Sequence, residues 1–249
     1  MNAPPRWKTA WITGASSGIG RALALQLAAA GTQVAVSARS ADKLQELGPG
    51  TFAYPLDVTD PIATQDTLLR IEKDLGPVEL VIFAAGTYAE VAADKINVAT
   101  FEYIMATNYQ GTVNGLAAVL PGMLARERGH VAWIASLTGY IGLPKAAAYG
   151  PSKAALISLA ESLKPELARK GIAISVVNPG FVATPMTANN EFAMPFLMQP
   201  EEAARRTLDG LARGRFEITY PRRLTLILKL ARLLPYSAYF WLIDRFILR

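Results

Sequence analysis

Short apolar runs rich in β-branched residues alternate with longer helical patterns along the whole chain. Several helical patterns end in glycine, the residue that most easily adopts the left-handed conformation after a helix. This alternation predicts an α/β fold with a doubly wound parallel sheet of about seven strands and helices on both faces. The expected strands are 9–13, 33–37, 51–54, 79–83, 130–135, 172–177 and 216–219. The expected helices are 19–30, 41–47, 61–75, 100–126, 148–169 and 200–211.

Length and composition suit one fairly large domain. The chain has 249 residues, of which 51% are hydrophobic and 18% charged, so it can bury a substantial core. We expect a single domain over 1–221 and a C-terminal amphipathic helical tail over 222–249. Residues 1–8 contain two prolines and no apolar run, which is unlike a signal peptide. The absence of cysteine excludes disulfides, and we expect a cytoplasmic protein.

Charge and metal-ligand content narrow the possible partners. The formal net charge is +5, and ten lysines and arginines lie in the last fifth of the chain, interleaved with leucine and aromatic residues. None of these basic residues belongs to a nucleic-acid-binding motif, so we expect no nucleic acid partner. The single histidine, His130, begins an expected strand and is interpreted as structural. One histidine without cysteine cannot build a zinc site, and we expect no metal.

A glycine-rich turn follows the first expected strand and leads into a helix. Glycines allow a tight turn and close approach of the backbone, and amide groups at a helix N-terminus attract phosphate. This strand-turn-helix context predicts a dinucleotide site, although the spacing is Gly-x3-Gly-x-Gly and a purely structural turn stays an alternative. The residues expected to bind the cofactor here are Gly14, Ser16, Ser17, Gly18, Ile19 and Gly20.

The end of the second expected strand indicates which dinucleotide is preferred. An NAD site commonly has an acidic residue about 20 residues beyond the glycines, where it binds the ribose hydroxyls. Here the segment is Ser37-Ala38-Arg39-Ser40, with no acid. Because a guanidinium can bind a 2′-phosphate through charge-assisted hydrogen bonds, Arg39 predicts NADP(H) in preference to NAD(H). The alternative is a solvent-facing arginine at the start of a helix.

Tyr149 follows Ser136 by thirteen residues, and Lys153 follows Tyr149 by four. The i,i+4 spacing places both side chains on one face of a helix. A tyrosine hydroxyl has an ordinary pKa near 10, and a nearby cation favours its phenolate. The pair therefore indicates acid/base chemistry, whereas a solvated surface pair is the structural alternative.

Together these motifs resemble the short-chain dehydrogenase/reductase family, and the match covers roughly residues 8–220. The matching features are the glycine turn, Asn108, Ser136, the Tyr149-x3-Lys153 pair and Asn178-Pro179-Gly180, all in the family's order and spacing. The resemblance implies a Rossmann-type fold and an NAD(P)-dependent oxidoreductase. It also implies a homodimer or homotetramer that associates through the long helices bearing Asn108 and Tyr149.

The resemblance also implies a role for each matching residue. Ser136 would hydrogen-bond the substrate oxygen, and Tyr149 would exchange a proton with it. Lys153 would lower the pKa of Tyr149 and bind the nicotinamide ribose, and Asn108 would hold a water that connects Lys153 to solvent. The remaining implied cofactor contacts are Asp57 and Val58 at the adenine, Ala85 and Gly86 after the fourth strand, and Pro179, Gly180, Val182 and Thr184 beside the nicotinamide. Many relatives have Asn-Asn-Ala-Gly where this chain has Phe83-Ala84-Ala85-Gly86, which leaves cofactor geometry as the point to examine.

The segment 184–200 is an apolar loop between a nicotinamide-facing strand end and the next helix, as a substrate lid would be. It predicts a small hydrophobic alcohol or ketone as substrate, such as a lipid, steroid or acyl compound. A loop packed into the core or a subunit interface is the alternative. The apolar residues concerned are Pro185, Met186, Phe192, Met194, Pro195, Phe196, Leu197 and Met198.

Residues 222–249 contain two leucine-rich helical segments separated by Pro235, with basic residues and an aromatic patch. No stretch of about 18 uncharged apolar residues occurs there, so we expect no spanning helix. The pattern suits an interfacial membrane helix, and it suits equally a tail over the substrate pocket or against a partner subunit. Peripheral membrane contact is therefore one of three open interpretations.

Two other functions compete with the oxidoreductase. A non-catalytic NADP-sensing protein could have the same fold, but binding alone gives no reason to keep Ser136, Tyr149 and Lys153. A sugar-nucleotide epimerase uses similar residues, but it usually has a larger substrate region than the roughly 70 residues after Pro179 allow.

Overall fold

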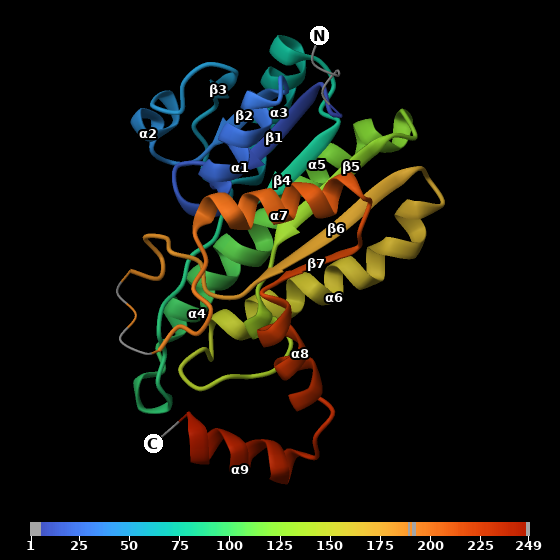
Figure 1. Ribbon diagram of the computed structural model, residues 1–249. Helices are drawn as coiled ribbons and strands as arrows, with labels where there is room; N and C mark the ends of the chain where they lie inside the picture. The colour runs from blue at the N-terminus through green and yellow to red at the C-terminus, as the bar shows by residue number, and fades with distance from the viewer. Residues whose placement is uncertain (1–5, 189, 191–192, 248–249) are drawn as a thin grey trace.

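The computed structural model describes residues 6–188, 190 and 193–247. Its centre is one seven-stranded sheet in the order β3-β2-β1-β4-β5-β6-β7, with every neighbouring pair parallel (Figure 1). The chain starts in the middle of the sheet, moves outward to β3, returns to β4 and continues to the other edge. This reversal confirms the predicted doubly wound α/β sheet. The strands are β1 (Thr9–Thr13), β2 (Gln33–Ser37), β3 (Thr51–Ala53), β4 (Leu80–Phe83), β5 (Gly129–Ile134), β6 (Ile172–Pro179) and β7 (Glu217–Tyr220).

Helices cover both faces of the sheet (Figure 1). On one face, α1 (Gly18–Ala29) packs against α7 (Pro200–Ala212), and on the other face lie α3 (Pro61–Leu75), α5 (Gly111–Ala125) and α6 (Tyr149–Ala168). The remaining helices of the described chain are α2 (Ala41–Gln45), α4 (Val98–Met105), α8 (Arg222–Ala231) and α9 (Tyr236–Phe246), with short 3-10 turns at Ala93–Lys95 and Leu137–Gly139.

The strands carry apolar side chains toward both helical layers, as expected for a parallel sheet buried on both faces. In β1, Trp11 belongs to the core under α3, α5 and α6, while Ala10 and Ile12 belong to the core under α1 and α7. Trp11 and Trp133 are among the largest fully buried side chains. Each such side chain stabilises the fold by about 1.5–3 kcal/mol relative to exposure. The two cores hold the strand ends in fixed positions.

The single helix predicted over 100–126 is wrong in one respect. Two helices, α4 and α5, are joined by a π-helical turn over Ala106–Gln110. A π turn inserts one residue into the helical ladder, and such turns often occur at functional sites. Here the turn contains Asn108, whose side chain leaves the helix to bind other elements. The π turn therefore reorients the Asn108 side chain, while the helix continues from α4 into α5.

The last two helices extend the molecule beyond the carboxyl ends of the strands (Figure 1). α8 leaves the end of β7, and α9 follows after Pro235. Lys229 of α8 is paired with Glu217 of β7, and the Tyr239 hydroxyl of α9 donates a hydrogen bond to the carbonyl of Gly142. Within the described residues, no helix has the length and apolar character needed to cross a bilayer.

Candidate active site

A cleft opens at the carboxyl ends of the central strands, where ligands bind in doubly wound sheets. Its walls come from the loops after β1, β4, β5 and β6 and from the first turns of α1 and α6. The structure thus brings together fourteen of the residues predicted from the sequence. The predicted residues that line the cleft are Gly14, Ser16, Ser17, Gly18, Ile19, Gly20, Gly86, Ser136, Tyr149, Lys153, Pro179, Gly180, Val182 and Thr184.

The glycines of the turn stand where the backbone conformation and the close packing require glycine. Gly14 and Gly18 have positive φ angles of 70° and 55°, a region that side chains disfavour. A Cβ on Gly14 would lie 2.5 Å from the amide nitrogen of Ala85, and one on Gly20 would lie 2.4 Å from the carbonyl oxygen of Gly14. Only glycine allows this close packing of turn, strand and helix.

The first turn of α1 has the features of an anion site. Ser17 precedes the helix in an extended conformation, its side chain does not cap the helix, and the first turn contains no acidic residue. The amide groups at this end therefore present partial positive charge to the cleft that Ser16 and Ser17 line. These residues fit the pyrophosphate of a dinucleotide.

Ser136, Tyr149 and Lys153 meet on the opposite wall. α6 begins at Tyr149, so Lys153 lies one turn later, with its Nζ 5.4 Å from the centroid of the tyrosine ring. Lys153 is buried and its Nζ donates a hydrogen bond of 2.9 Å to the carbonyl of Ile134, the last residue of β5. Ser136 follows two residues after Ile134, and its Oγ accepts a hydrogen bond from the Thr138 amide. The end of β5 thereby positions Ser136 and Lys153, and the start of α6 positions Tyr149.

Burial dominates the proton affinities of this group. Burial raises the pKa of Tyr149 to about 12, against a hydrogen bond with Ser136 that lowers it. Burial lowers the pKa of Lys153 to about 7 from an ordinary 10.5. Burial is the largest influence on the pKa of Tyr149 in this structure, and the role of Lys153 in lowering that pKa stays a prediction. Near neutral pH, Tyr149 is a neutral phenol.

Asn108 lies behind the cleft and does not line it. Its Oδ1 accepts a hydrogen bond of 2.7 Å from the Thr87 amide, and its Nδ2 donates to the Thr87 carbonyl and to the Ser152 Oγ. Ser152 in turn donates to the carbonyl of Tyr149. Asn108 thus joins the loop after β4 to the first turn of α6. The water-holding role of Asn108 stays a prediction.

The three residues predicted for the adenine side lie at neighbouring strand ends. Arg39 follows β2, and Asp57 and Val58 follow β3. The pKa of Asp57 is lowered, mainly by the Thr59 amide and further by the positive charge of Arg39. Arg39 is exposed, and its guanidinium approaches the Tyr103 hydroxyl at 3.5 Å. An exposed guanidinium therefore follows β2, where an NAD site commonly has an acid.

The segment Phe83-Ala84-Ala85-Gly86 keeps a link between strands despite the missing asparagines. The Ala85 amide donates a hydrogen bond of 3.3 Å to Thr13 Oγ1, which connects the ends of β4 and β1. Phe83 packs edge-on against Trp11, with ring centroids 6.2 Å apart. The packing of Phe83 against Trp11 and the hydrogen bond to the Thr13 hydroxyl thus connect β4 and β1, as the asparagine side chains of relatives would.

The sequence did not single out several residues of the site. Tyr88 packs edge-on against Tyr149, with ring centroids 5.2 Å apart, and Thr187 lines the cleft together with Met186 of the predicted lid. Ser152 lies between Tyr149 and Lys153 in the sequence, and this position is the only sequence feature that pointed to a role for Ser152 in the site. Of the predicted lid, Phe192 lies outside the described residues, while Phe196 and Leu197 are 46% exposed.

Comparison with known proteins agrees with this geometry. The family model described as short chain dehydrogenase matches residues 8–194. An uncharacterized oxidoreductase of Myxococcus xanthus is 38% identical over 236 residues, which cover 92% of this chain and 93% of that protein. The 3-oxoacyl-[acyl-carrier-protein] reductase of Escherichia coli is 35% identical over 184 residues, or 72% of this chain and 75% of the relative. Among solved structures, a variant of actinorhodin polyketide ketoreductase with NADPH aligns with a TM-score of 0.79 at 27% identity, covering 88% of this chain and 97% of that one.

The fold and the cleft define a dinucleotide-dependent oxidoreductase. The chain belongs to the short-chain dehydrogenase family, since the family model covers most of its length and relatives above 30% identity span more than two thirds of it.

Proposed function

We propose that this protein is an NADP-dependent reductase that transfers hydride to a hydrophobic ketone, or the reverse from the alcohol. The observation that carries the proposal is the convergence of Ser136, Tyr149 and Lys153 on the cleft that the glycine turn also lines. A binding role alone gives no reason for an acid/base set in that place. The bound nicotinamide would supply the hydride.

The three side chains would each do one part of the proton chemistry. Ser136 would donate a hydrogen bond to the substrate oxygen, and the neutral phenol of Tyr149 would give that oxygen its proton. The resulting phenolate would be stabilised by Lys153, whose Nζ is 5.4 Å from the tyrosine ring centroid. A tyrosine held neutral near pH 7 can donate a proton in carbonyl reduction, and its phenolate accepts a proton in the reverse reaction.

The remaining walls would hold the cofactor. The turn from Gly14 to Gly20 would bind the pyrophosphate, and Pro179, Gly180, Val182 and Thr184 would contact the nicotinamide half. Asp57 and Val58 would contact the adenine. The exposed guanidinium of Arg39 would bind the 2′-phosphate of NADP, because a charge-assisted hydrogen bond stabilises the complex by about 1.5–3 kcal/mol.

A hydrophobic substrate is supported by the entrance of the cleft. Met186 lines it, and Phe196 and Leu197 on the same loop are about half exposed. Two relatives have names that describe related chemistry, the oxoacyl reductase of Escherichia coli and the polyketide ketoreductase. We therefore propose a ketone on an acyl or lipid-like chain, with 184–200 as the lid.

Three further statements stay predictions. They are the homodimer or homotetramer through the helices that bear Asn108 and Tyr149, the cytoplasmic location, and the division into a domain over 1–221 and a tail over 222–249. Of these segments, residues 1–5, 189, 191–192 and 248–249 lie outside the described chain.

The proposal can be tested with the purified protein and a Tyr149→Phe variant. Both are titrated with NADPH and NADH, and both are assayed on a panel of hydrophobic ketones. We expect NADPH to bind more tightly than NADH, and we expect turnover in the wild type that Tyr149→Phe reduces by at least about a hundredfold while binding is kept. Tight NADPH binding without turnover of any ketone would instead favour the NADP-sensing alternative. Turnover confined to small polar sugars would contradict the hydrophobic substrate.

A further inference from the structure

We propose that helices α8 and α9 and the basic hollow beside α8 form a docking surface for an anionic phospholipid bilayer. This surface is separate from the cleft, and the proposal does not depend on the proposed reaction. Of the three interpretations of the tail given above, the proposal selects contact with a membrane. Three observations carry it, namely an unpartnered apolar face, an excess of positive charge, and a hollow lined by arginines.

The first observation is the exposed apolar face of the two helices, here called the tail face. Thr225, Tyr239 and Ile243 are buried against the domain, so the opposite sides of α8 and α9 point away from it. Large side chains on those sides are 55–63% exposed. Soluble monomers rarely expose so many large apolar side chains together. The tail face consists of Leu226, Ile227, Leu230, Phe240 and Trp241.

The second observation is the charge around the tail face. Residues 222–247 include five basic residues and one acidic residue, Asp244. Amphipathic helices with basic residues on their flanks and tryptophan on the apolar side lie in the interface of anionic membranes. Two copies of such a surface would repel each other, whereas anionic headgroups complement it. The charge therefore selects a bilayer over a second copy of the chain.

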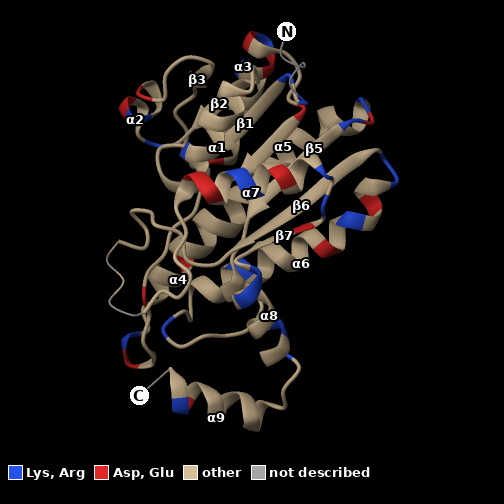
Figure 2. Ribbon diagram, in the orientation of Figure 1, with Lys and Arg blue, Asp and Glu red and all other residues tan. Residues whose placement is uncertain are grey.

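The third observation is a hollow of about 400 Å³ between α7, β7 and the start of α8. Arginines line it, among them Arg213, Arg215 and Arg222. Figure 2 shows blue segments of Lys and Arg on α7 and at the start of α8. These three arginines form no ion pair with a described carboxylate, whereas Arg205 and Arg206, which also line the hollow, are paired with Glu202. Unpaired guanidiniums facing one hollow suit phosphate groups.

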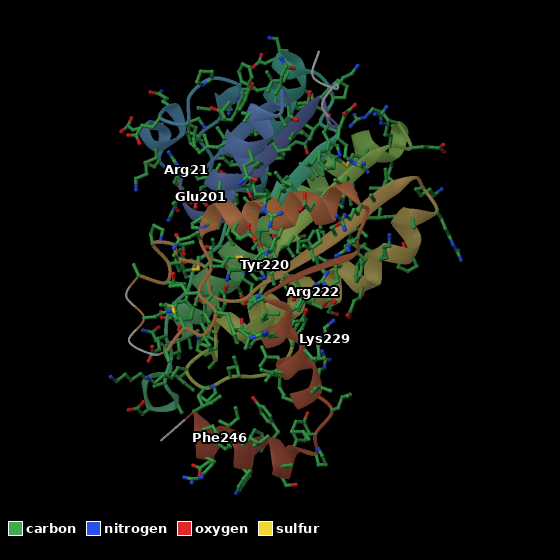
Figure 3. All side chains as sticks on the ribbon, viewed as in Figure 1. Arg21, Glu201, Tyr220, Arg222, Lys229 and Phe246 are labelled. Atoms are coloured by element: carbon green, nitrogen blue, oxygen red, sulfur yellow. The ribbon has the colours of Figure 1, made fainter. Side chains whose placement is uncertain are left out.

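The hollow and the tail face are continuous. Arg222, Leu226 and Leu230 follow each other at i,i+4 spacing, so they lie along one side of α8 (Figure 3 labels Arg222 at the start of α8 and Phe246 at the end of α9). The helix of ten residues is about 15 Å long. A phospholipid has the same order of chemistry, a phosphate followed by an acyl chain. The arginine end would meet headgroups and the leucine side would meet acyl chains.

The first test is vesicle binding of the full-length protein, read by the fluorescence of Trp241. Vesicles of pure phosphatidylcholine are compared with vesicles of equal parts phosphatidylcholine and phosphatidylglycerol. Trp11 and Trp133 are fully buried and Trp7 is partly buried beside His130, so the exposed Trp241 should give most of the response. We expect a blue shift and quenching by brominated acyl chains with the anionic vesicles, and no such change in a Trp241→Phe variant that still sediments with them.

The second test separates charge from apolar contact. Each arginine near an anionic surface adds about fivefold to binding, so Arg215→Gln with Arg222→Gln should weaken binding to the anionic vesicles about 25-fold. Exposed Arg169, at the end of α6, provides the matched charge control as Arg169→Gln. Leu230→Ser with Trp241→Ser should weaken binding at least about tenfold. Ile62→Ser with Leu69→Ser removes equally exposed apolar groups from α3, at the far end of the molecule (Figure 1).

Three results would overturn the proposal. The first is that the wild type sediments with neither kind of vesicle. The second is equal binding to both kinds, which would remove the role of the arginines. The third is a dimer that Leu230→Ser with Trp241→Ser dissociates, without any vesicle binding, which would assign the tail face to a second copy. None of these readouts uses turnover, so failure of the proposed reaction leaves them unchanged.

Discussion

Replacement of Lys153 by methionine should make the folded protein more stable. Lys153 is 4% exposed, and the methionine side chain has a similar length without the ammonium group. The ammonium group is expensive in this position, because burial lowers its pKa from 10.5 to about 7. A group whose pKa is depressed on folding destabilises the folded state while it binds a proton in the unfolded chain. Lys153→Met removes that cost.

The magnitude follows from the shift in pKa. Each pKa unit corresponds to about 1.36 kcal/mol, so the lysine costs about 5 kcal/mol well below pH 7. This cost decreases as pH rises from 7 toward 10.5, because the unfolded chain then also loses the proton. The variant leaves the Ile134 carbonyl without its donor, which costs about 1–3 kcal/mol at any pH. The net gain should be about 2–4 kcal/mol near pH 6 and should decrease by about 3 kcal/mol by pH 9.5.

Urea denaturation at pH 6, 7 and 9.5 measures this difference. Far-UV circular dichroism follows unfolding of the wild type, of Lys153→Met and of Lys170→Met, which removes an exposed lysine. We expect the free energy of unfolding of Lys153→Met to exceed that of the wild type at pH 6 and to converge with it or fall below it at pH 9.5. The Lys170→Met difference should stay flat. A Lys153→Met difference that is also flat, or that grows with pH, would refute the assignment of the cost to burial of the ammonium group.

Three other predictions concern packing, cofactor choice and pH. Gly115→Ala should destabilise the fold by about 1–3 kcal/mol in urea denaturation, because its Cβ would lie 2.2 Å from Phe83 Cε1, and Phe83→Leu should restore most of the loss. Arg39→Ala should weaken NADPH binding by at least about tenfold in a fluorescence titration and leave NADH unchanged, and equal losses for both would contradict the 2′-phosphate role. Burial lowers the pKa of His130 to about 4, so stability should be lost as pH falls from 6.5 to 4, by about 3 kcal/mol, and His130→Gln should remove this dependence in acid denaturation.

The strands and most helices could be predicted because their signals are local. Each strand of the described chain coincides with one of the expected apolar runs to within about three residues, and burial on both faces explains why these runs are continuous rather than alternating. The dinucleotide turn is also local, since glycine is required where φ is positive and the backbone approaches another chain segment. Those features follow from residue type at short spacing.

The π turn at Asn108 could not be predicted, because its cause lies elsewhere in the chain. Its side chain binds Thr87, 21 residues earlier, and Ser152, 44 residues later. The burial that raises the pKa of Tyr149 could not be predicted for the same reason. Spacing gave the neighbouring cation, but the depth of burial comes from the whole fold. The buried contact between the His130 Nε2 and the Ser175 Oγ could not be predicted either, because it joins two strands that are distant in sequence.

A polar network ties the tail to the wall of the cleft. Glu217 Oε1 accepts hydrogen bonds from the Tyr140 hydroxyl at 2.5 Å and from Asn178 Nδ2 at 3.3 Å, while Glu217 Oε2 pairs with Lys229 of α8. Burial raises the pKa of Glu217 and these donors lower it more, so the carboxylate is kept charged. Asn178 directly precedes Pro179, which lines the cleft.

Because of this network, substitutions test the role of the tail more cleanly than truncation does. A chain that ends after β7 would lose Lys229 and leave the half-buried carboxylate of Glu217 without its cation, which costs stability at the cleft wall. Loss of vesicle binding by such a chain would therefore have two possible causes, a missing surface or a disturbed domain. Substitutions on the exposed tail face leave Lys229 and Tyr239 in place, so a loss of binding by Leu230→Ser with Trp241→Ser has only the first cause.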